Sequence, residues 1–222
     1  VKELADEHNF DCIMIPGGLP PRAALGYSFV PLFRILRYLG LIEEGEEVLD
    51  ETYQMMKANV QEYSKLEGNE ALDLAHKLKD TLPIIYSDSK LLEAVNIRWR
   101  GQLEGNAKIL CYGNVFPEMN HNEIIGWEYT PHLKDLLSVV FLTDRDDNRR
   151  VNFRMEVFRE LVKEDAKSIT ILETEGESRL CRIFSLVQLV DWVSLYLAIL
   201  NRQNPTKIEY IDTMKAKLAS FN

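Results

Sequence analysis

Four kinds of side chain in this sequence could together move a proton next to a carbonyl group. Glu104 and His121 lie before and after a mostly apolar run. A carboxylate can take a carbon-bound proton, a histidine can open a sugar ring as acid or base, and a cation stabilises the enediolate oxygen. The cations are Arg22 and, near the end of the chain, Lys215 or Lys217. Satisfied surface charges would give the same pattern, so spacing alone leaves both interpretations open.

The composition limits the class of protein. The 222 residues are 46% apolar and 9% aromatic, which is enough for a packed core. The net charge of −9 argues against a general nucleic-acid or anionic-membrane binder, although local cations could still hold an anionic small substrate. The longest apolar stretch, 186–200, contains polar residues and is shorter than the roughly 20 residues of a membrane span. It therefore predicts a core helix.

The cysteines and the first residues indicate the compartment and the completeness of the chain. Cys12, Cys111 and Cys181 lie far apart, each among apolar neighbours, and no CxxC motif occurs. This pattern predicts buried reduced thiols in a cytoplasmic protein, with no metal site. The opening VKELADEHNF is charged and mixed, so it predicts the tail of a helix that began earlier rather than a signal peptide. We expect the chain to be a fragment.

Short apolar runs alternate with helical patterns along the chain. The runs that predict strands are 11–16, 82–86, 107–115, 137–143 and 168–174. Apolar strands that alternate with helices indicate a mostly parallel sheet covered on both faces. We therefore predict one α/β domain over residues 1–222, a three-layer α/β/α sandwich with a five-stranded sheet and a C-terminal helical tail.

The helical segments include a long tail and a charged hairpin. The predicted helices lie at 23–40 with a kink near Pro31, at 43–80 as an outer hairpin broken at Gly68–Asn69, and at 90–101, 152–163, 178–201 and 208–221. The tail covers 178–222. Ser87–Asp88–Ser89 precedes the third of these helices, and it could cap that helix or bind phosphate through backbone amides. Capping explains these residues well, and we prefer it.

Several motifs resemble one family of enzymes. They are IPGGLPPRAALGY at 15–27, RW and QLEGNAK within 98–108, EMNHNEIIGW at 118–127, FSLV and DWVS within 184–194, NPT at 204–206 and IDTMK at 211–215. In this order they resemble the bifunctional phosphoglucose/phosphomannose isomerases of the sugar isomerase (SIS) family, along most of the chain. The resemblance implies a C-terminal SIS domain with its tail.

The resemblance also implies roles for individual residues. Arg22 matches the arginine that binds the substrate and stabilises the enediolate. His121 matches the ring-opening histidine, which in this family reaches the active site of the partner subunit of a homodimer. Lys215 matches the second ring-opening residue, with Lys217 close by. Thr206 is similar in place to a substrate-binding threonine tied to accepting the mannose C2 epimer.

The base is the point where the sequence departs from the family pattern. That pattern reads Asn-Glu-Asn-Ala-Lys, and in strict register its glutamate falls on Gly105, so that Glu104 stands one position early. Glu104 is therefore a candidate base rather than a matched one. Glu118 and Glu123 compete with it, although Glu118 could simply orient the imidazole of His121 while Glu123 caps a helix or faces solvent.

Two functions follow from these observations. The first is the catalytic C-terminal half of an aldose–ketose isomerase that interconverts glucose 6-phosphate, or mannose 6-phosphate, with fructose 6-phosphate through a cis-enediol. The shift is redox-neutral, so no metal or organic cofactor is expected. The resemblance implies that the Gly- and Ser/Thr-rich phosphate loops belong to an N-terminal SIS domain that this sequence lacks, and the chain alone should be inactive. The alternative is a non-catalytic SIS module that binds sugar phosphates or supports dimerisation.

Overall fold

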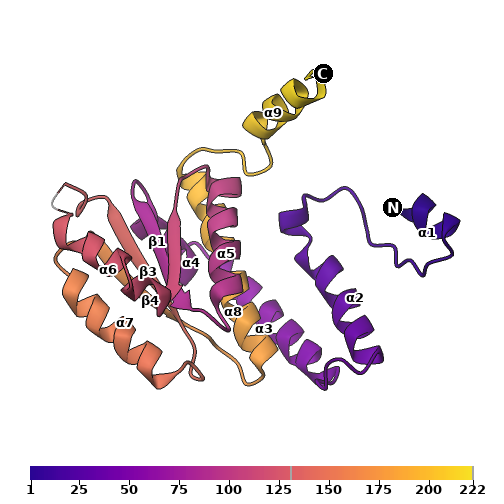
Figure 1. Ribbon diagram of the computed structural model, residues 1–222, viewed down its shortest axis with the longest axis horizontal. Coiled ribbons are helices and arrows are strands. Elements are labelled where there is room, and N and C mark those ends of the chain that lie inside the picture. Colours follow the sequence, from indigo (N-terminus) through magenta and orange to yellow (C-terminus); the bar gives the residue numbers. More distant parts are fainter. Residues whose placement is uncertain (131, 222) are drawn as a thin grey trace. The chain divides into compact units, whose positions relative to one another are not determined.

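Four parallel strands lie at the centre of the larger of two units in this chain (Figure 1). The computed structural model describes residues 1–130 and 132–221. The strands are β1 (Leu82–Asp88), β2 (Tyr112–Phe116), β3 (Leu137–Thr143) and β4 (Ser168–Glu173), in the order β2-β1-β3-β4. Every neighbouring pair is parallel. The two central strands are buried along almost their whole length, because helices cover both faces.

Helices form a layer on each face of the sheet (Figure 1). One layer holds α5 (Glu93–Gln102) and α8 (Arg179–Leu200), with α4 (Glu70–Leu78) packed against α8. The other holds α6 (Glu123–Gly126) and α7 (Arg149–Val162). The predicted three-layer α/β/α sandwich is confirmed.

Aromatic rings form the centre of the core on the α7 side. Tyr86 of β1, Phe116 of β2 and Phe141 of β3 point to this face and surround Phe158 of α7, which is fully buried. The Phe158 ring centroid lies 5.3 Å from that of Tyr86 and 5.9 Å from that of Phe116. Side chains alternate between faces along a strand, so the same strands present their other residues to α5 and α8.

Helix α5 approaches the sheet closely between β1 and β2. The Asn96 amide donates hydrogen bonds to the Ile85 carbonyl at 3.0 Å and to the Asn114 carbonyl at 3.1 Å. A side chain at Gly113 would have no room, since its Cβ would lie 2.6 Å from Asn96 Oδ1 and 2.9 Å from the Ile85 carbonyl oxygen. The glycine therefore allows α5 to reach the backbone of two strands.

The long helix α8 is the core helix that the sequence predicts. Within the described residues it is the one helix with the length and apolar content of a membrane span. Most of its residues are buried inside the unit, where it contacts α4, α5 and the π-helical turn Leu103–Ala107. Burial of this kind is typical of the central helix of an α/β domain.

The first 47 residues form a separate unit, Val1–Glu47. It contains α1 (Lys2–Glu7), a 3-10 turn at Pro21–Ala23 and α2 (Leu25–Tyr38), with Pro31 inside the helix. The predicted strand at 11–16 is wrong: the stretch is irregular, and Ile13 and Met14 are exposed. A strand needs a neighbour for its backbone groups, and no strand is assigned within this unit, in which every residue is described. The sheet accordingly has four strands rather than five.

Other boundaries differ from the prediction for physical reasons. The predicted strand at 107–115 begins only at Tyr112, because the π-helical turn extends α5 to Ala107. The hairpin at 43–80 is α3 (Glu47–Tyr63) followed by α4, but α4 buries four apolar residues against the core rather than forming an outer face. Cys181 is buried, Cys111 is half-buried and Cys12 is exposed, so the prediction of three buried thiols is wrong for Cys12. After α8, α9 (Glu209–Ala219) completes the tail with no buried residue.

Asn69 joins α3, α4 and α8 through its side chain, which is almost fully buried. Its amide oxygen accepts from Leu72 N–H at 3.2 Å and caps α4, as the predicted break at Gly68–Asn69 requires. Its amide nitrogen donates to the Tyr63 carbonyl at 2.6 Å, the Lys65 carbonyl at 2.8 Å and the Tyr196 hydroxyl at 3.0 Å. One side chain thus closes the turn between two helices and ties it to α8.

We predict that Asn69→Ala lowers the free energy of unfolding by about 2–4 kcal/mol, because it removes a helix cap and leaves buried carbonyl groups without a donor. Urea unfolding followed by circular dichroism measures the change. The control is Gln54→Ala on the exposed side of α3, which should stay within about 0.5 kcal/mol of the wild type. Equal stability of the two variants would contradict the role assigned to Asn69.

Candidate active site

The predicted site residues lie on five separate elements. Arg22 is half-buried in the 3-10 turn of the first unit. In the larger unit, Glu104 lies in the π-helical turn, His121 follows the 3-10 turn Glu118–Asn120, Thr206 lies in the turn after α8 and Lys215 lies in α9. These four side chains are exposed.

The π-helical turn that carries Glu104 is fixed to α8 by amide groups on both sides. Asn106 Nδ2 donates to Ser194 Oγ at 2.9 Å, and Asn201 Nδ2 donates to the Ala107 carbonyl at 3.5 Å. The turn ends at Lys108, whose φ of 60° lies in the left-handed region. Single π-helical turns of this type are common at functional sites.

An ion pair anchors the helix that leads into this turn. Arg98 donates to Asp191 of α8 through Nε at 3.1 Å and Nη2 at 2.6 Å, and Gln102 Nε2 donates to the same carboxylate at 2.7 Å. Burial raises the pKa of Asp191, although the contacts with Arg98 and Gln102 oppose this change. The two-pronged geometry fixes the orientation of α5 on α8 as well as its position.

Cys111 lies against the candidate base. Its Sγ is 3.8 Å from Glu104 Oε1 and 3.6 Å from the Arg100 carbonyl. Burial, followed by the Glu104 carboxylate, raises the pKa of Cys111 to about 12, so the thiol stays protonated and is a weak donor to Glu104. The Glu104 side chain is exposed.

His121 lies in a segment that folds over the opposite face of the sheet. Met119 and Trp127, before and after it, are buried in the aromatic core beside Phe158. The imidazole itself is exposed. The segment thus presents a histidine at the surface from a backbone that is held on both sides.

Glu123 is the acceptor of three hydrogen bonds from the sheet. The Tyr86 hydroxyl donates to Oε1, while the Tyr112 hydroxyl donates to Oε2 at 3.1 Å and Asn114 Nδ2 to the same oxygen at 2.6 Å. Burial, followed by contact with Glu123, raises the pKa of Tyr86 and also that of Tyr112, which keeps both hydroxyls as donors. The alternatives that Glu123 caps a helix or faces solvent are therefore wrong.

The sheet separates Glu104 from His121. The π-helical turn packs against α5 and α8, while Met119 and Trp127 pack in the core on the α7 side. In Figure 1, α6 and α5 lie on opposite sides of the strands. Within one copy of this chain the fold does not bring the candidate base and the candidate ring-opening histidine together.

The strand–helix junction at Ser87–Asp88–Ser89 is capped by its own side chain. The Asp88 carboxylate accepts from the backbone N–H groups of Lys90 at 2.7 Å, Leu91 at 3.2 Å and Leu92 at 3.0 Å. Asp88 is buried, so these amides already hold a negative group. The Asp88 carboxylate thus satisfies the amides of the turn that leads into α5, which supports capping over phosphate binding at this junction.

Further carboxylates follow β3 at the carboxyl end of the sheet, the end at which Asp88 also lies. Arg182 of α8 donates through Nε to Asp144 Oδ2 at 2.8 Å and through Nη2 to Asp146, and Thr174 also donates to Asp144. Burial alone would raise the pKa of Asp144, but the hydrogen bonds from Thr174 and Arg182 lower it. Asp147 accepts from Asp144 N–H at 2.8 Å.

Asp147 is the carboxyl group of this cluster whose pKa the fold raises. Burial raises its pKa to about 6; the Asp144 N–H opposes the increase, while the carboxylates of Asp88, Asp144 and Asp146 add to it. Ligands of open α/β sheets bind outside the carboxyl ends of the strands, where the strand order reverses. In this chain that position, between β1 and β3, is filled by acidic side chains, which would repel a phosphate.

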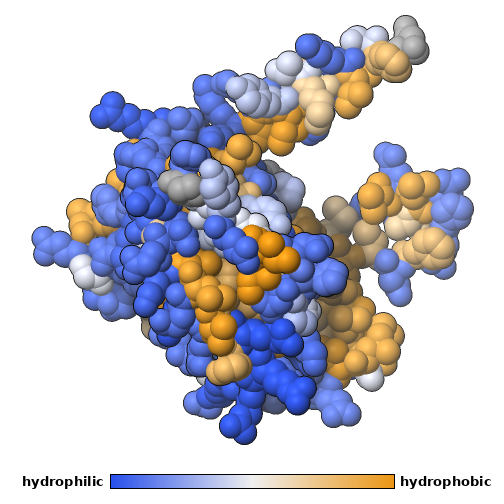
Figure 2. Space-filling view, turned by 60° about the vertical axis from the view of Figure 1, so that its left-hand side comes forward, coloured by the Kyte–Doolittle hydropathy of each residue, from blue (hydrophilic) through white to orange (hydrophobic). Residues whose placement is uncertain are grey.

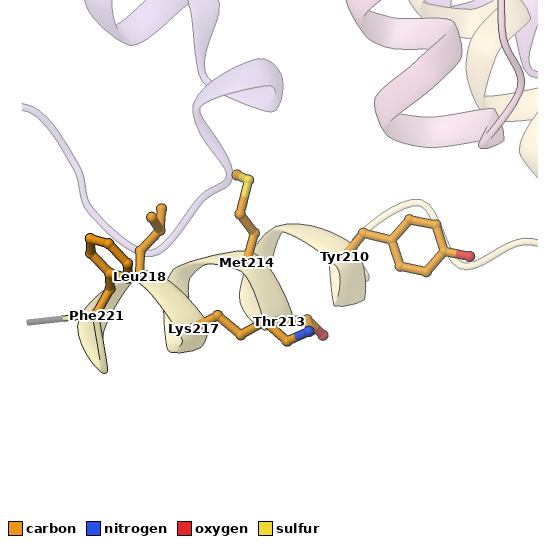
Figure 3. Close-up of a pocket in the computed structure, with 6 residues that line it drawn as sticks. All are labelled: Tyr210, Thr213, Met214, Lys217, Leu218 and Phe221. Carbon is orange, nitrogen blue, oxygen red and sulfur yellow. The ribbon is translucent and has the colours of Figure 1, made fainter.

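The two tail lysines point in different directions. Residues two positions apart on a helix differ by about 200°, so Lys215 and Lys217 cannot both face one site. Lys217 lines a shallow apolar groove along α9 with Tyr210, Thr213, Met214, Leu218 and Phe221 (Figure 3), whereas Lys215 lies outside it. Figure 2 shows apolar side chains gathered along this helix.

Thr206 uses its polar groups locally. Its hydroxyl donates to Asn204 Oδ1 at 2.7 Å, and its backbone N–H donates to the same oxygen at 2.9 Å. This arrangement is an Asx turn, which fixes the chain between α8 and α9.

The anchors of the π-helical turn are the residues that sequence reasoning missed. Arg98, Gln102 and Asn106 recur at intervals of four, and Asp191 and Ser194 recur at an interval of three, so each set shares one helix face. This spacing was the available signal. The partners could not be assigned, because they lie about 90 residues apart and only the packing of α5 on α8 brings them together.

Comparison with known families identifies most of the larger unit. Residues 67–218 match the family model described as bacterial phospho-glucose isomerase C-terminal SIS domain. The solved structure of a glucose-6-phosphate isomerase like protein from Thermus thermophilus superposes with a TM-score of 0.65 at 20% identity, over 85% of this chain and 60% of that one. At this identity the structural similarity supports the fold alone.

Similarity to curated proteins extends over the whole chain. A protein named bifunctional phosphoglucose/phosphomannose isomerase from Caldicellulosiruptor bescii is 44% identical over 100% of this chain and 66% of its own length. One of the same name from Aquifex aeolicus is 31% identical over 97% of this chain and 64% of its own length. The chain therefore spans about two thirds of these relatives.

We predict that Asp147→Asn stabilises the protein at pH 7.5 by about 2–3 kcal/mol, since the pKa of Asp147 lies about two units above its ordinary value and each unit corresponds to about 1.4 kcal/mol. The pKa of Asp147 is about 6 in the folded state and 3.8 as the ordinary value. The folded state disfavours the ionised form, so the penalty is complete above pH 6 and disappears below about pH 4. Urea unfolding at pH 7.5 and pH 4 measures it.

Asp135→Asn is the matched control, because this carboxylate is exposed and its loss should not matter at either pH. A difference between wild type and Asp147→Asn that is the same at pH 4 and pH 7.5 would show that ionisation of Asp147 is not the cause.

Proposed function

Because the chain belongs to the family of bacterial phosphoglucose isomerase C-terminal SIS domains, we propose that it is the catalytic C-terminal half of an aldose–ketose isomerase. The reaction interconverts glucose 6-phosphate, and its C2 epimer mannose 6-phosphate, with fructose 6-phosphate. The observation that carries this proposal is the similarity of the whole chain to relatives named bifunctional phosphoglucose/phosphomannose isomerase. We also propose that the enzyme is cytoplasmic and that all 222 residues form one C-terminal SIS domain with its tail.

The chemistry assigned to each residue is proton transfer next to a carbonyl. Glu104 moves the proton between C1 and C2 through a cis-enediol, and Arg22 stabilises the enediolate oxygen. His121 and Lys215 transfer protons in ring opening, and Thr206 lies beside the substrate as a binding residue. No electron leaves the sugar, so these side chains suffice without a redox cofactor.

The separation of Glu104 from His121 by the sheet supports a homodimeric site. The turn of Glu104 packs against α5 and α8 on one face of the sheet, whereas the segment of His121 packs on the other face, and within the described residues no hydrogen bond or ion pair joins the two side chains. If both act on one substrate, His121 comes from a partner subunit. The exposed apolar side of α9 also supports assembly, because an isolated helix of 11 residues is marginally stable in water.

We propose that a second domain binds the phosphate group of the substrate. The switch point between β1 and β3 is acidic, and the Asp88 carboxylate occupies the amides of the neighbouring junction. We assign phosphate binding to an N-terminal SIS domain, which fits relatives about half as long again as this chain. Binding of the phosphate would hold the reacting carbons in place for Glu104.

A second function is favoured by one observation, the glycine at position 105. The family glutamate corresponds to Gly105, and Glu104 precedes it in a helical turn. Successive side chains in a helical turn point about 100° apart, so Glu104 faces a different direction from a glutamate at the family position. If this offset prevents proton transfer, the chain is a non-catalytic SIS module that binds sugar phosphates or mediates dimerisation.

We predict that the chain turns over glucose 6-phosphate only together with an N-terminal SIS domain, and that Glu104→Gln then lowers kcat by about 10³-fold, as loss of a general base does. A coupled assay for fructose 6-phosphate measures both. Glu128→Gln, also exposed, is the matched control and should keep full activity. Full activity in Glu104→Gln would move the base elsewhere, and inactivity of every combination would favour the binding module.

We further predict that Lys215→Ala lowers kcat by about 10²-fold while Lys217→Ala changes it less than threefold, because the two lysines face different sides of α9. The same assay compares them. Circular dichroism of both variants controls for loss of the helix. The opposite order of effects would transfer the ring-opening role to Lys217, and equal losses would indicate that α9 acts only as a structural element.

A further inference from the structure

The segment from Pro117 to Tyr129 is held on the sheet at points before and after His121. Met119, two residues before the histidine, is 1% exposed, and Trp127, six residues after it, is 7% exposed. Both pack in the same aromatic cluster. Apolar contacts fix the ends of the segment in this way, but they leave the direction of the exposed imidazole to the residues between them.

Glu123 accepts three of the hydrogen bonds that hold this segment, and Asn120 Oδ1 accepts a further one from Arg154 of α7 at 3.5 Å. The Glu123 carboxylate accepts from the Tyr86 hydroxyl on β1 and from Tyr112 and Asn114 on β2. The Trp127 indole N–H in turn donates to the Tyr86 hydroxyl at 3.1 Å. The carboxylate therefore joins two strands to the start of α6, and it shares Tyr86 with the buried end of the segment.

We propose that Glu123 is a positioning residue for His121, holding the segment so that the imidazole projects from the sheet in one orientation. The proposal rests on the isomerase function proposed above, since it is the ring-opening step that needs the orientation. Two residues of chain span at most about 7 Å, so a fixed Glu123 leaves little freedom to His121. Hydrogen bonds to a carboxylate are strong and directional, and those from Tyr86 and Asn114 are partly buried, which suits this task.

The same contacts remove Glu123 from the candidate bases. A carboxylate has about four lone-pair sites, and three of them accept hydrogen bonds from the sheet. A proton taken from carbon would have to displace one of these donors. Glu123 acts on the reaction through His121 rather than on the substrate.

The experiment begins with hydrogen exchange on the full chain. Glu123→Gln keeps the size of the side chain but replaces one of its two acceptor oxygens with an N–H₂ group, which then faces at least one of the three donors. The amides of residues 118–126 should therefore exchange at least tenfold faster. Glu128→Gln removes the same charge from the same segment at an exposed position, and its exchange should stay within twofold of the wild type. Unchanged exchange in Glu123→Gln would overturn the proposal.

The second readout is kinetic and uses the chain with an N-terminal SIS domain. Glu123→Gln should lower kcat by about 10–100-fold with KM within threefold, and it should add nothing to the loss caused by His121→Ala. Faster exchange with an unchanged kcat, or losses that multiply in the double variant, would overturn the link to His121.

The two proposals fail in different ways. A wild-type assembly without turnover would overturn the isomerase function and the catalytic link together. The hydrogen-exchange comparison would still decide by itself whether Glu123 holds the segment of His121, because it requires no substrate.

Discussion

The burial of β1 between two helical layers is the constraint on which the rest of the structure depends. Its side chains alternate between the two faces of the sheet, and the strand makes different contacts on each face. On one face Tyr86 packs against Phe158 and donates to Glu123. On the other face the Ile85 carbonyl accepts from Asn96 of α5. At the end of the strand Asp88 caps the chain that leads into α5. One strand thus fixes the helices of both layers.

Polar contacts decide how the two candidate elements are held. The turn of Glu104 depends on α8 through Asn106 and on the ion pair of Arg98 with Asp191. The segment of His121 depends on β1 and β2 through the contacts of Glu123. Both elements therefore present an exposed titratable group from a backbone fixed by partly buried hydrogen bonds. Such groups can act with little reorganisation when a substrate arrives.

The separation of these elements is the reason why we propose that the enzyme depends on assembly. A single copy offers a carboxylate on one side of the sheet and an imidazole on the other. In the proposed function, a second subunit supplies the histidine and a further domain binds the phosphate of the substrate. The acidic groups around Asp147 support this division, because they make the usual ligand position of an open sheet unsuitable for a phosphate.

The sequence by itself determined the sheet class, four of the strands, the core helix α8, the cap at Asp88 and the family. Apolar periodicity, turn residues and motifs are local properties, so they are visible directly in the amino-acid sequence. The sequence misplaced a strand at 11–16, because an apolar run becomes a strand only where another strand can pair with it. Only the tertiary structure decided that Arg98 meets Asp191, that three donors converge on Glu123, and that the sheet separates Glu104 from His121. Each of these depends on packing between residues far apart in the chain, which no local pattern specifies.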